Sequence, residues 1–134
     1  MKIYIKFDMK IIRNNIIPFP GYKCINLFGV LFARKKAKID EVTINHEAIH
    51  SRQFVELMVL FAATSVFVRW WLPLFAPLFF YVWYAVEWLI HLIRFRSTYI
   101  AYRRISFERE AYANEGDASY LNGRYWFNFL RYIR

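Results

Sequence analysis

Residues 40–69 limit the possible folds of this chain most strongly, because they hold no glycine or proline and include His46-Glu47-Ala48-Ile49-His50. A helix can run through such a stretch without a break. Asp40 is suited to cap its first turn, and Glu41 favours the positive end of the helix dipole. Side chains four residues apart share one face of a helix, so both imidazoles can reach the same metal ion. We therefore expect a long helix over residues 40–69 that carries part of a zinc site.

Glu47 completes an H-E-x-x-H arrangement. In this arrangement the glutamate lies beside the metal, where its carboxylate can take a proton from water and pass it to a leaving amine. A catalytic zinc site also needs a third protein ligand and an open fourth position. The third ligand must come from another part of the chain.

Two glutamates in a second predicted helix, residues 106–122, are candidates for the third ligand. Ser106 can cap this helix, and Asn122-Gly123 can end it. Glu110 and Asn114 share a face, so Glu110 could bind the metal while Asn114 accepts a hydrogen bond from a ligating imidazole. Glu108 competes with Glu110 but lies about 200° around the helix from it, so only one of them can face the histidines.

The motif His46-Glu47-x-x-His50, followed by Glu110-x-x-Ala113-Asn114, resembles the H-E-x-x-H … E-x-x-A-D pattern of the gluzincin metallopeptidases, which include membrane peptidases and the minigluzincins. The resemblance implies a zincin-like helical domain and one Zn²⁺ held by His46, His50 and Glu110, with Glu47 as catalytic base. It favours Glu110 over Glu108. Asn114 departs from the aspartate of the pattern, and its neutral carbonyl has a weaker electrostatic effect on an imidazole. The string of residues 105–115 is also similar to one in small bacterial proteins of unassigned activity.

Two further groups of side chains are candidates for roles near the site. Stabilisation of a tetrahedral intermediate would need a Tyr, His or Arg, and the candidates are Tyr112, Tyr120 and Arg103. Glu87 and His91 form another pair four residues apart. This pair could be a metal or proton site, or a structural ion pair that involves Arg52 or Arg109, and we favour the structural interpretation.

Hydropathy and charge suggest a membrane. Apolar residues make up 58% of the chain, and an apolar helix is predicted over residues 73–95. Residues 70–86, which include the first part of this helix, carry no charge. Of the 19 Lys and Arg residues, only Arg69 lies between Phe54 and His91. The positive-inside rule then predicts a helical hairpin in a bacterial inner membrane, with both ends and the metal site facing the cytoplasm. The alternative is a soluble cytoplasmic domain in which both helices are core helices.

The length of 134 residues favours a single domain, mainly α with a small N-terminal β-hairpin or sheet in residues 1–39. Alternating residues 2–7 and the β-branched residues 24–34 predict strands, with a type II turn at Pro20-Gly21 between them. A strand near the metal could pair with a peptide substrate or could only cover the helices. Residues 97–104 are expected to form a polar connection, and residues 124–134 an amphipathic helical tail.

These features predict zinc-dependent hydrolysis of a peptide or protein substrate at a membrane. The alternative is a membrane-associated protein whose zinc is structural and which has no catalytic activity. A single cysteine, Cys24, excludes an intramolecular disulfide and a zinc cluster built from several thiolates. Nucleic acid is disfavoured as a partner because the aromatic residues fall in apolar runs instead of alternating with Lys and Arg.

Overall fold

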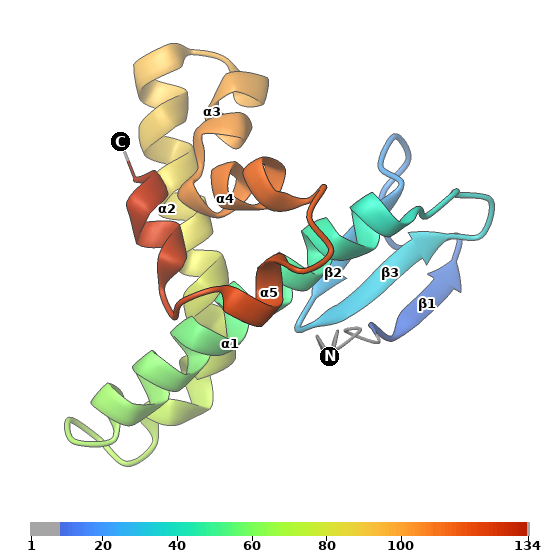
Figure 1. The fold of residues 1–134 in the computed structure, drawn as a ribbon. Coiled ribbons are helices and arrows are strands. Elements are labelled where there is room, and N and C mark those ends of the chain that lie inside the picture. Colours follow the sequence, from blue (N-terminus) through green and yellow to red (C-terminus); the bar gives the residue numbers. More distant parts are fainter. Residues whose placement is uncertain (1–8, 134) are drawn as a thin grey trace.

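A computed structural model describes residues 9–133, which are mainly helical with one small sheet. Figure 1 shows the two long helices α1 and α2 as a hairpin. The sheet lies beside the N-terminal part of α1, and the helices α3 and α4 lie beside the C-terminal half of α2. The helices are α1 (Glu41–Ser65), α2 (Ala76–Phe95), α3 (Thr98–Arg104), α4 (Ser106–Asn114) and α5 (Tyr120–Gly123), with 3₁₀ turns η1 (Leu72–Phe75) and η2 (Asn128–Tyr132). The strands are β1 (Ile11–Asn14), β2 (Cys24–Leu27) and β3 (Val30–Arg34).

The sheet has the order β1-β3-β2, with β1 parallel and β2 antiparallel to β3. The strand predicted over residues 24–34 is divided into β2 and β3, because Phe28 and Gly29 both have positive φ, 53° and 80°, and form a tight turn between them. Such turns match the twist of a hairpin. The turn predicted at Pro20-Gly21 is confirmed by Gly21 at φ 100° and by the Tyr22 N–H, which donates to the Phe19 carbonyl at 3.3 Å. The strand predicted at residues 2–7 lies outside the described residues.

The predicted motif helix is confirmed as α1. The Asp40 carboxylate accepts from the Thr43 N–H at 2.8 Å and so satisfies a free donor of the first turn. The helix ends at Ser65, earlier than residue 69. The predicted apolar helix is also confirmed, with α2 beginning at Ala76 after the 3₁₀ turn η1, which contains Pro73.

The predictions for the C-terminal third of the chain need correction. Residues 98–104 form the helix α3 instead of a continuous polar connection, and the Ser97 hydroxyl caps it by accepting from the Ile100 N–H at 3.3 Å. The Ser106 side chain does not cap α4. Its N–H and hydroxyl donate instead to the Glu87 carboxylate, at 2.6 and 2.8 Å. Glu87 therefore joins α2 to the positive end of α4.

The helix predicted over residues 106–122 ends at Asn114. Beyond that point the carbonyls of Glu115 and Asp117 accept from the Asn45 side-chain amide of α1, at 2.7 and 2.9 Å. These hydrogen bonds fix a non-helical loop around Gly116. Within residues 124–133, the helix predicted for the tail is limited to the 3₁₀ turn η2.

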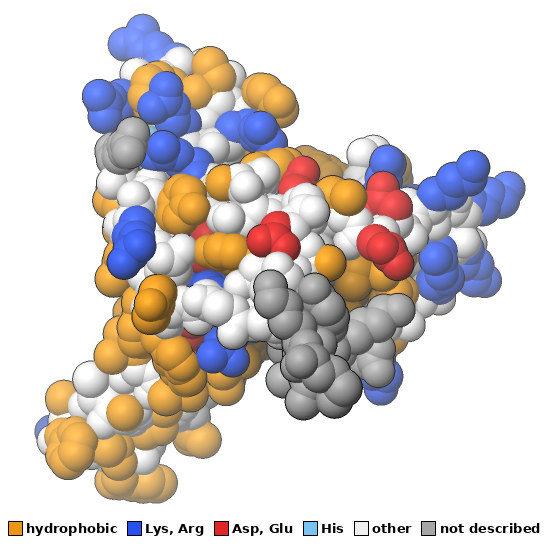
Figure 2. All heavy atoms as spheres, viewed as in Figure 1, with side chains coloured by type: hydrophobic (Ala, Val, Ile, Leu, Met, Phe, Trp, Pro, Cys, Tyr) orange, Lys and Arg blue, Asp and Glu red, His pale blue; other side chains and the backbone are white. Residues whose placement is uncertain are grey.

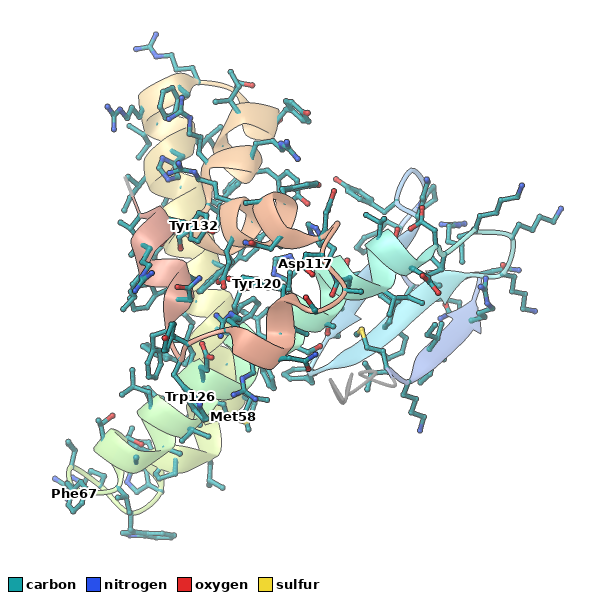
Figure 3. All side chains as sticks on the ribbon, viewed as in Figure 1. Met58, Phe67, Asp117, Tyr120, Trp126 and Tyr132 are labelled. Atoms are coloured by element: carbon teal, nitrogen blue, oxygen red, sulfur yellow. The ribbon has the colours of Figure 1, made fainter. Side chains whose placement is uncertain are left out.

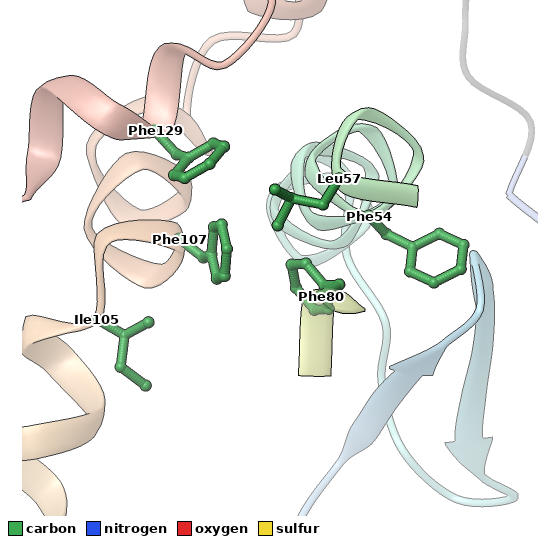
Figure 4. Packing of buried hydrophobic residues seen from close by; sticks show 6 residues of the cluster. All are labelled: Phe54, Leu57, Phe80, Ile105, Phe107 and Phe129. Carbon is green, nitrogen blue, oxygen red and sulfur yellow. The ribbon is translucent and has the colours of Figure 1, made fainter. Parts of the chain in front are cut away.

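The hydrophobic core joins the α1–α2 hairpin to α4 and η2. Figure 4 shows its six buried members, which are Phe54, Leu57, Phe80, Ile105, Phe107 and Phe129. The Phe107 ring lies 4.6 Å from the Phe80 ring and 4.7 Å from the Phe129 ring, measured between centroids. Because Phe107 and Ile105 anchor the start of α4 in this core, the next residue, Glu108, is held against α1.

Candidate metal centre

Three buried side chains from two helices converge in the structure: His46 and His50 of α1, and Glu108 of α4. The two Nε2 atoms lie 3.1 Å apart. One Glu108 oxygen lies 3.3 Å from Nε2 of His46, and the other lies 3.3 Å from Nε2 of His50. These positions let one atom from each residue bind the same ion. The structure thus brings the two predicted histidines together, but the third member is Glu108 and not the predicted Glu110.

Glu110 does not join this group. It is fully buried on another side of α4, where it accepts from Nε of Arg124 at 2.5 Å and from the Tyr120 hydroxyl at 2.7 Å. The helical spacing correctly separated Glu108 from Glu110, but spacing alone could not show which face of α4 packs on α1. The buried Arg124 decides this, because its cation attracts Glu110 and Glu56 to one ion network.

The outer nitrogens of both imidazoles have oxygen partners. Nδ1 of His46 lies 2.7 Å from a Glu115 carboxylate oxygen, and Nδ1 of His50 lies 2.8 Å from the side-chain oxygen of Gln53. Such acceptors place the ring proton on Nδ1 and leave the lone pair of Nε2 directed at Glu108. Asn114, predicted to orient an imidazole, donates instead to the Glu110 carbonyl at 2.7 Å. Glu115, one residue later, has the predicted role.

Gln53 connects His50 to the ion network of Glu110. Its side-chain NH₂ group donates to Glu110 at 2.8 Å and to the Phe107 carbonyl at 3.2 Å. Because the nitrogen end of the amide faces these acceptors, the oxygen end faces His50. The Glu110 carboxylate therefore acts on the metal centre indirectly, by orienting the amide that orients His50.

The electrostatics of the centre are those of a buried carboxylate beside two imidazoles. Burial alone lowers the pKa of His50, but the adjacent Glu108 carboxylate outweighs it and raises that pKa to about 9. Burial raises the pKa of Glu108, yet His50 and His46 hold it well below its usual range. Among the described residues, one Glu108 oxygen is buried without a hydrogen bond. A proton or a metal ion can fill this position, and two nitrogens with one carboxylate suit zinc.

The centre forms the floor of a cleft of about 820 Å³ between the α1–α2 hairpin on one side and β2 with the connection that precedes it on the other. Its walls are mainly apolar and aromatic, and they include Phe19, Ile25, Phe54 and Tyr81. Glu47 lines the cleft beside the histidines. Burial, opposed in part by His50 and His46, raises the pKa of Glu47, which brings this carboxylate nearer to the range of a general base at neutral pH.

Asn26 and Tyr81 hold the sheet over the centre, and neither was singled out from the sequence. The Asn26 side-chain amide donates to the Glu47 carbonyl and to the Ser51 hydroxyl, both at 2.8 Å. The Phe28 N–H donates to the Tyr81 hydroxyl at 2.7 Å. A lone Asn in a strand gives no sequence signal for such a contact, because its partner is 21 residues away on another element.

The predicted stabilisers of a tetrahedral intermediate do not line the main cleft. The Tyr120 hydroxyl donates to Glu110. Tyr112 meets His46 edge to face, with ring centroids 4.6 Å apart, and the Arg103 guanidinium lies 3.7 Å from the Tyr112 centroid. Tyr84 and Tyr102 line the cleft instead. The Tyr84 hydroxyl donates to Glu108 at 2.8 Å and orients the carboxylate.

The second predicted pair also has other partners. His91 is buried beside Phe95, and Glu87 accepts from the Trp83 indole at 2.8 Å in addition to Ser106. Arg52 lies 3.6 Å from Glu56, and Arg109 donates to the Tyr132 carbonyl at 2.7 Å. Glu87 thus has a structural role, but it binds the N-terminus of α4 and not one of the predicted arginines.

In comparisons with known proteins, no family model, curated protein or solved structure matches the chain.

Proposed function

We propose that the protein is a zinc-dependent peptidase, with His46, His50 and Glu108 as ligands and Glu47 as general base. The observation that supports this most directly is the convergence of three buried ligand groups on the floor of a cleft that Glu47 also lines. A zinc ion bound there would polarise a peptide carbonyl and make water more acidic. Gluzincin-type chemistry remains part of this proposal, with Glu108 in the ligand position.

Each side chain then has a defined task. Glu47 takes a proton from water and delivers it to the leaving amine, and its raised pKa suits both steps. Gln53 and Glu115 hold the imidazoles with Nε2 facing inward. Tyr84 fixes Glu108, and Tyr102 is in reach of the cleft as a hydrogen-bond donor.

A peptide is the favoured substrate because of the free edge of β2. In the hairpin, the Arg34 N–H donates to the Lys23 carbonyl at 3.1 Å, so alternate residues of β2 bond to β3. The backbone groups of Cys24 and Asn26 then point away from β3, and β2 is the last strand on that side within residues 9–133. An extended peptide could add to this edge at the cleft.

A structural metal site is the second candidate. The two histidines are only 7% and 8% exposed, and a metal there would join α1 to α4. Glu47→Gln separates the two proposals: the variant should bind zinc stoichiometrically and fail to cleave a peptide library that the parent cleaves. A parent that binds zinc but cleaves nothing in detergent or in vesicles would favour the structural role. A parent without zinc affinity would refute both.

We place the protein at the inner face of a bacterial membrane, with the metal centre on the cytoplasmic side. This proposal depends on the 24-residue apolar segment Leu72–Phe95, in which only 17% of an apolar 18-residue stretch is buried. Fractionation of expressing cells tests it, and recovery of the full chain in the soluble fraction would contradict it. Carbonate extraction of the membrane fraction then separates insertion from surface contact.

A further inference from the structure

The helix α2 has an unusual distribution of side chains between its two faces. Its exposed face carries Leu78, Val82, Val86, Leu89, Ile90 and Ile93. These positions follow helical spacing, so they form one stripe along nearly the whole helix. A helix on the surface of a soluble domain normally carries polar side chains on this face.

The opposite face of α2 holds its polar groups. Glu87 bonds to Ser106, the Tyr84 hydroxyl bonds to Glu108, and His91 is buried. Polar groups directed inward and aliphatic groups directed outward are the arrangement expected of a helix in contact with lipid.

The exposed apolar surface continues around the end of the hairpin. Beyond the core residues Leu57 and Phe80, α1, η1 and α2 project as a finger with Phe67 at its tip and Met58 nearer its base (Figure 3). Phe67 is 89% exposed and Trp70 is 82% exposed. Figure 2 shows the finger covered by hydrophobic side chains. Residues 57–86 contain a single charge, Arg69.

A bilayer fits this surface better than a second copy of the chain. A protein interface is one patch with a polar rim, whereas this surface covers the tip and extends onto α1 through Val59 and Leu60. Cationic side chains lie at both ends of the α2 stripe, with Arg69 at the tip and Arg94 and Arg96 at the other end. These charges complement anionic lipid headgroups.

The rest of the fold limits the depth of contact. The helices α3 and α4 adjoin the C-terminal half of α2 in Figure 1, and α3 carries the exposed Arg103 and Arg104. A full crossing by α2 would bring these charges into hydrocarbon, where charged side chains are strongly disfavoured. The structure therefore favours contact with one leaflet over a transmembrane hairpin.

We propose that the outer face of α2 and the hairpin tip dock into one leaflet of an anionic membrane, with the aliphatic stripe against the acyl chains. This proposal is independent of the peptidase assignment, because none of its residues belongs to the metal centre. The docked face is opposite the core side of α2, so the cleft stays outside the hydrocarbon.

Nitroxide labelling of the full chain tests the docking. In a Cys24→Ser background, Val86→Cys and Ile90→Cys place labels on the stripe, and Lys36→Cys places a control on the exposed β3–α1 connection. On vesicles of phosphatidylethanolamine and phosphatidylglycerol, the stripe labels should become accessible to oxygen and protected from a water-soluble nickel chelate. The Lys36 label should remain accessible to the chelate.

The double variant Val86→Glu/Ile90→Glu supplies a second readout. It should reduce co-sedimentation with the same vesicles at least tenfold while it retains the parental far-ultraviolet circular dichroism and urea midpoint, which report an intact fold. Stripe labels that stay accessible to the nickel chelate on vesicles would overturn the proposal. Dipolar coupling between labels on two chains, with exclusion of both oxygen and nickel, would also overturn it and assign the face to a second copy.

Discussion

Glu108→Gln and Glu110→Gln are the same chemical change two residues apart on α4, and the structure predicts different outcomes for them. Glu108 lies 3.3 Å from both Nε2 atoms, so its variant loses a charged ligand. The loss of an outer partner of a metal site costs about 10–100-fold in affinity, or about 1.4–2.7 kcal/mol. Because Glu108 is itself a ligand, Glu108→Gln should lower zinc affinity by more than about 100-fold.

Glu110→Gln should act mainly on folding. It weakens charge-assisted hydrogen bonds to the buried Arg124 and should lower the free energy of unfolding by about 1.5–3 kcal/mol. Because Glu110 contacts the centre only through Gln53, zinc affinity should fall by no more than about 100-fold. Metal analysis, zinc competition titration and urea denaturation of both variants measure these effects. If Glu110→Gln lost zinc and Glu108→Gln retained it, the ligand assignment would be refuted.

Three further outcomes are expected. Gln53→Leu should weaken zinc binding by about 10–100-fold, measured by competition titration, because His50 loses the acceptor of its Nδ1 proton; unchanged affinity would exclude the proposed positioning. In metal-free protein, the raised pKa of His50 contributes stability that is complete below its usual value of 6.5 and is lost as pH rises through about 9, so calorimetry should give a lower melting temperature at pH 9.5 than at pH 6.5. Phe107→Ala should cost about 3–5 kcal/mol in urea denaturation, since the side chain is fully buried between Phe80 and Phe129.

Local signals in the sequence predicted the long helices well. Asp40 and the absence of Gly and Pro indicated α1, and H-E-x-x-H spacing placed two imidazoles on one face of it. These features depend on residues close together in the chain, for which helical geometry is fixed. The helix predicted over residues 106–122 ends at Asn114 instead, because Asn45, some 70 residues away, binds the carbonyls that follow Asn114.

The sequence alone thus determined a helix that presents His46 and His50 to one point. Only the tertiary structure decided that Glu108 meets them and that Glu110 does not. Both glutamates are compatible with α4, and helical spacing says only that they face different ways. The choice depends on how α4 is rotated, which the core packing of Phe107 and the charge of Arg124 set together. Arg124 lies 14 residues from Glu110 and 68 from Glu56, so its influence arises only when the chain is folded.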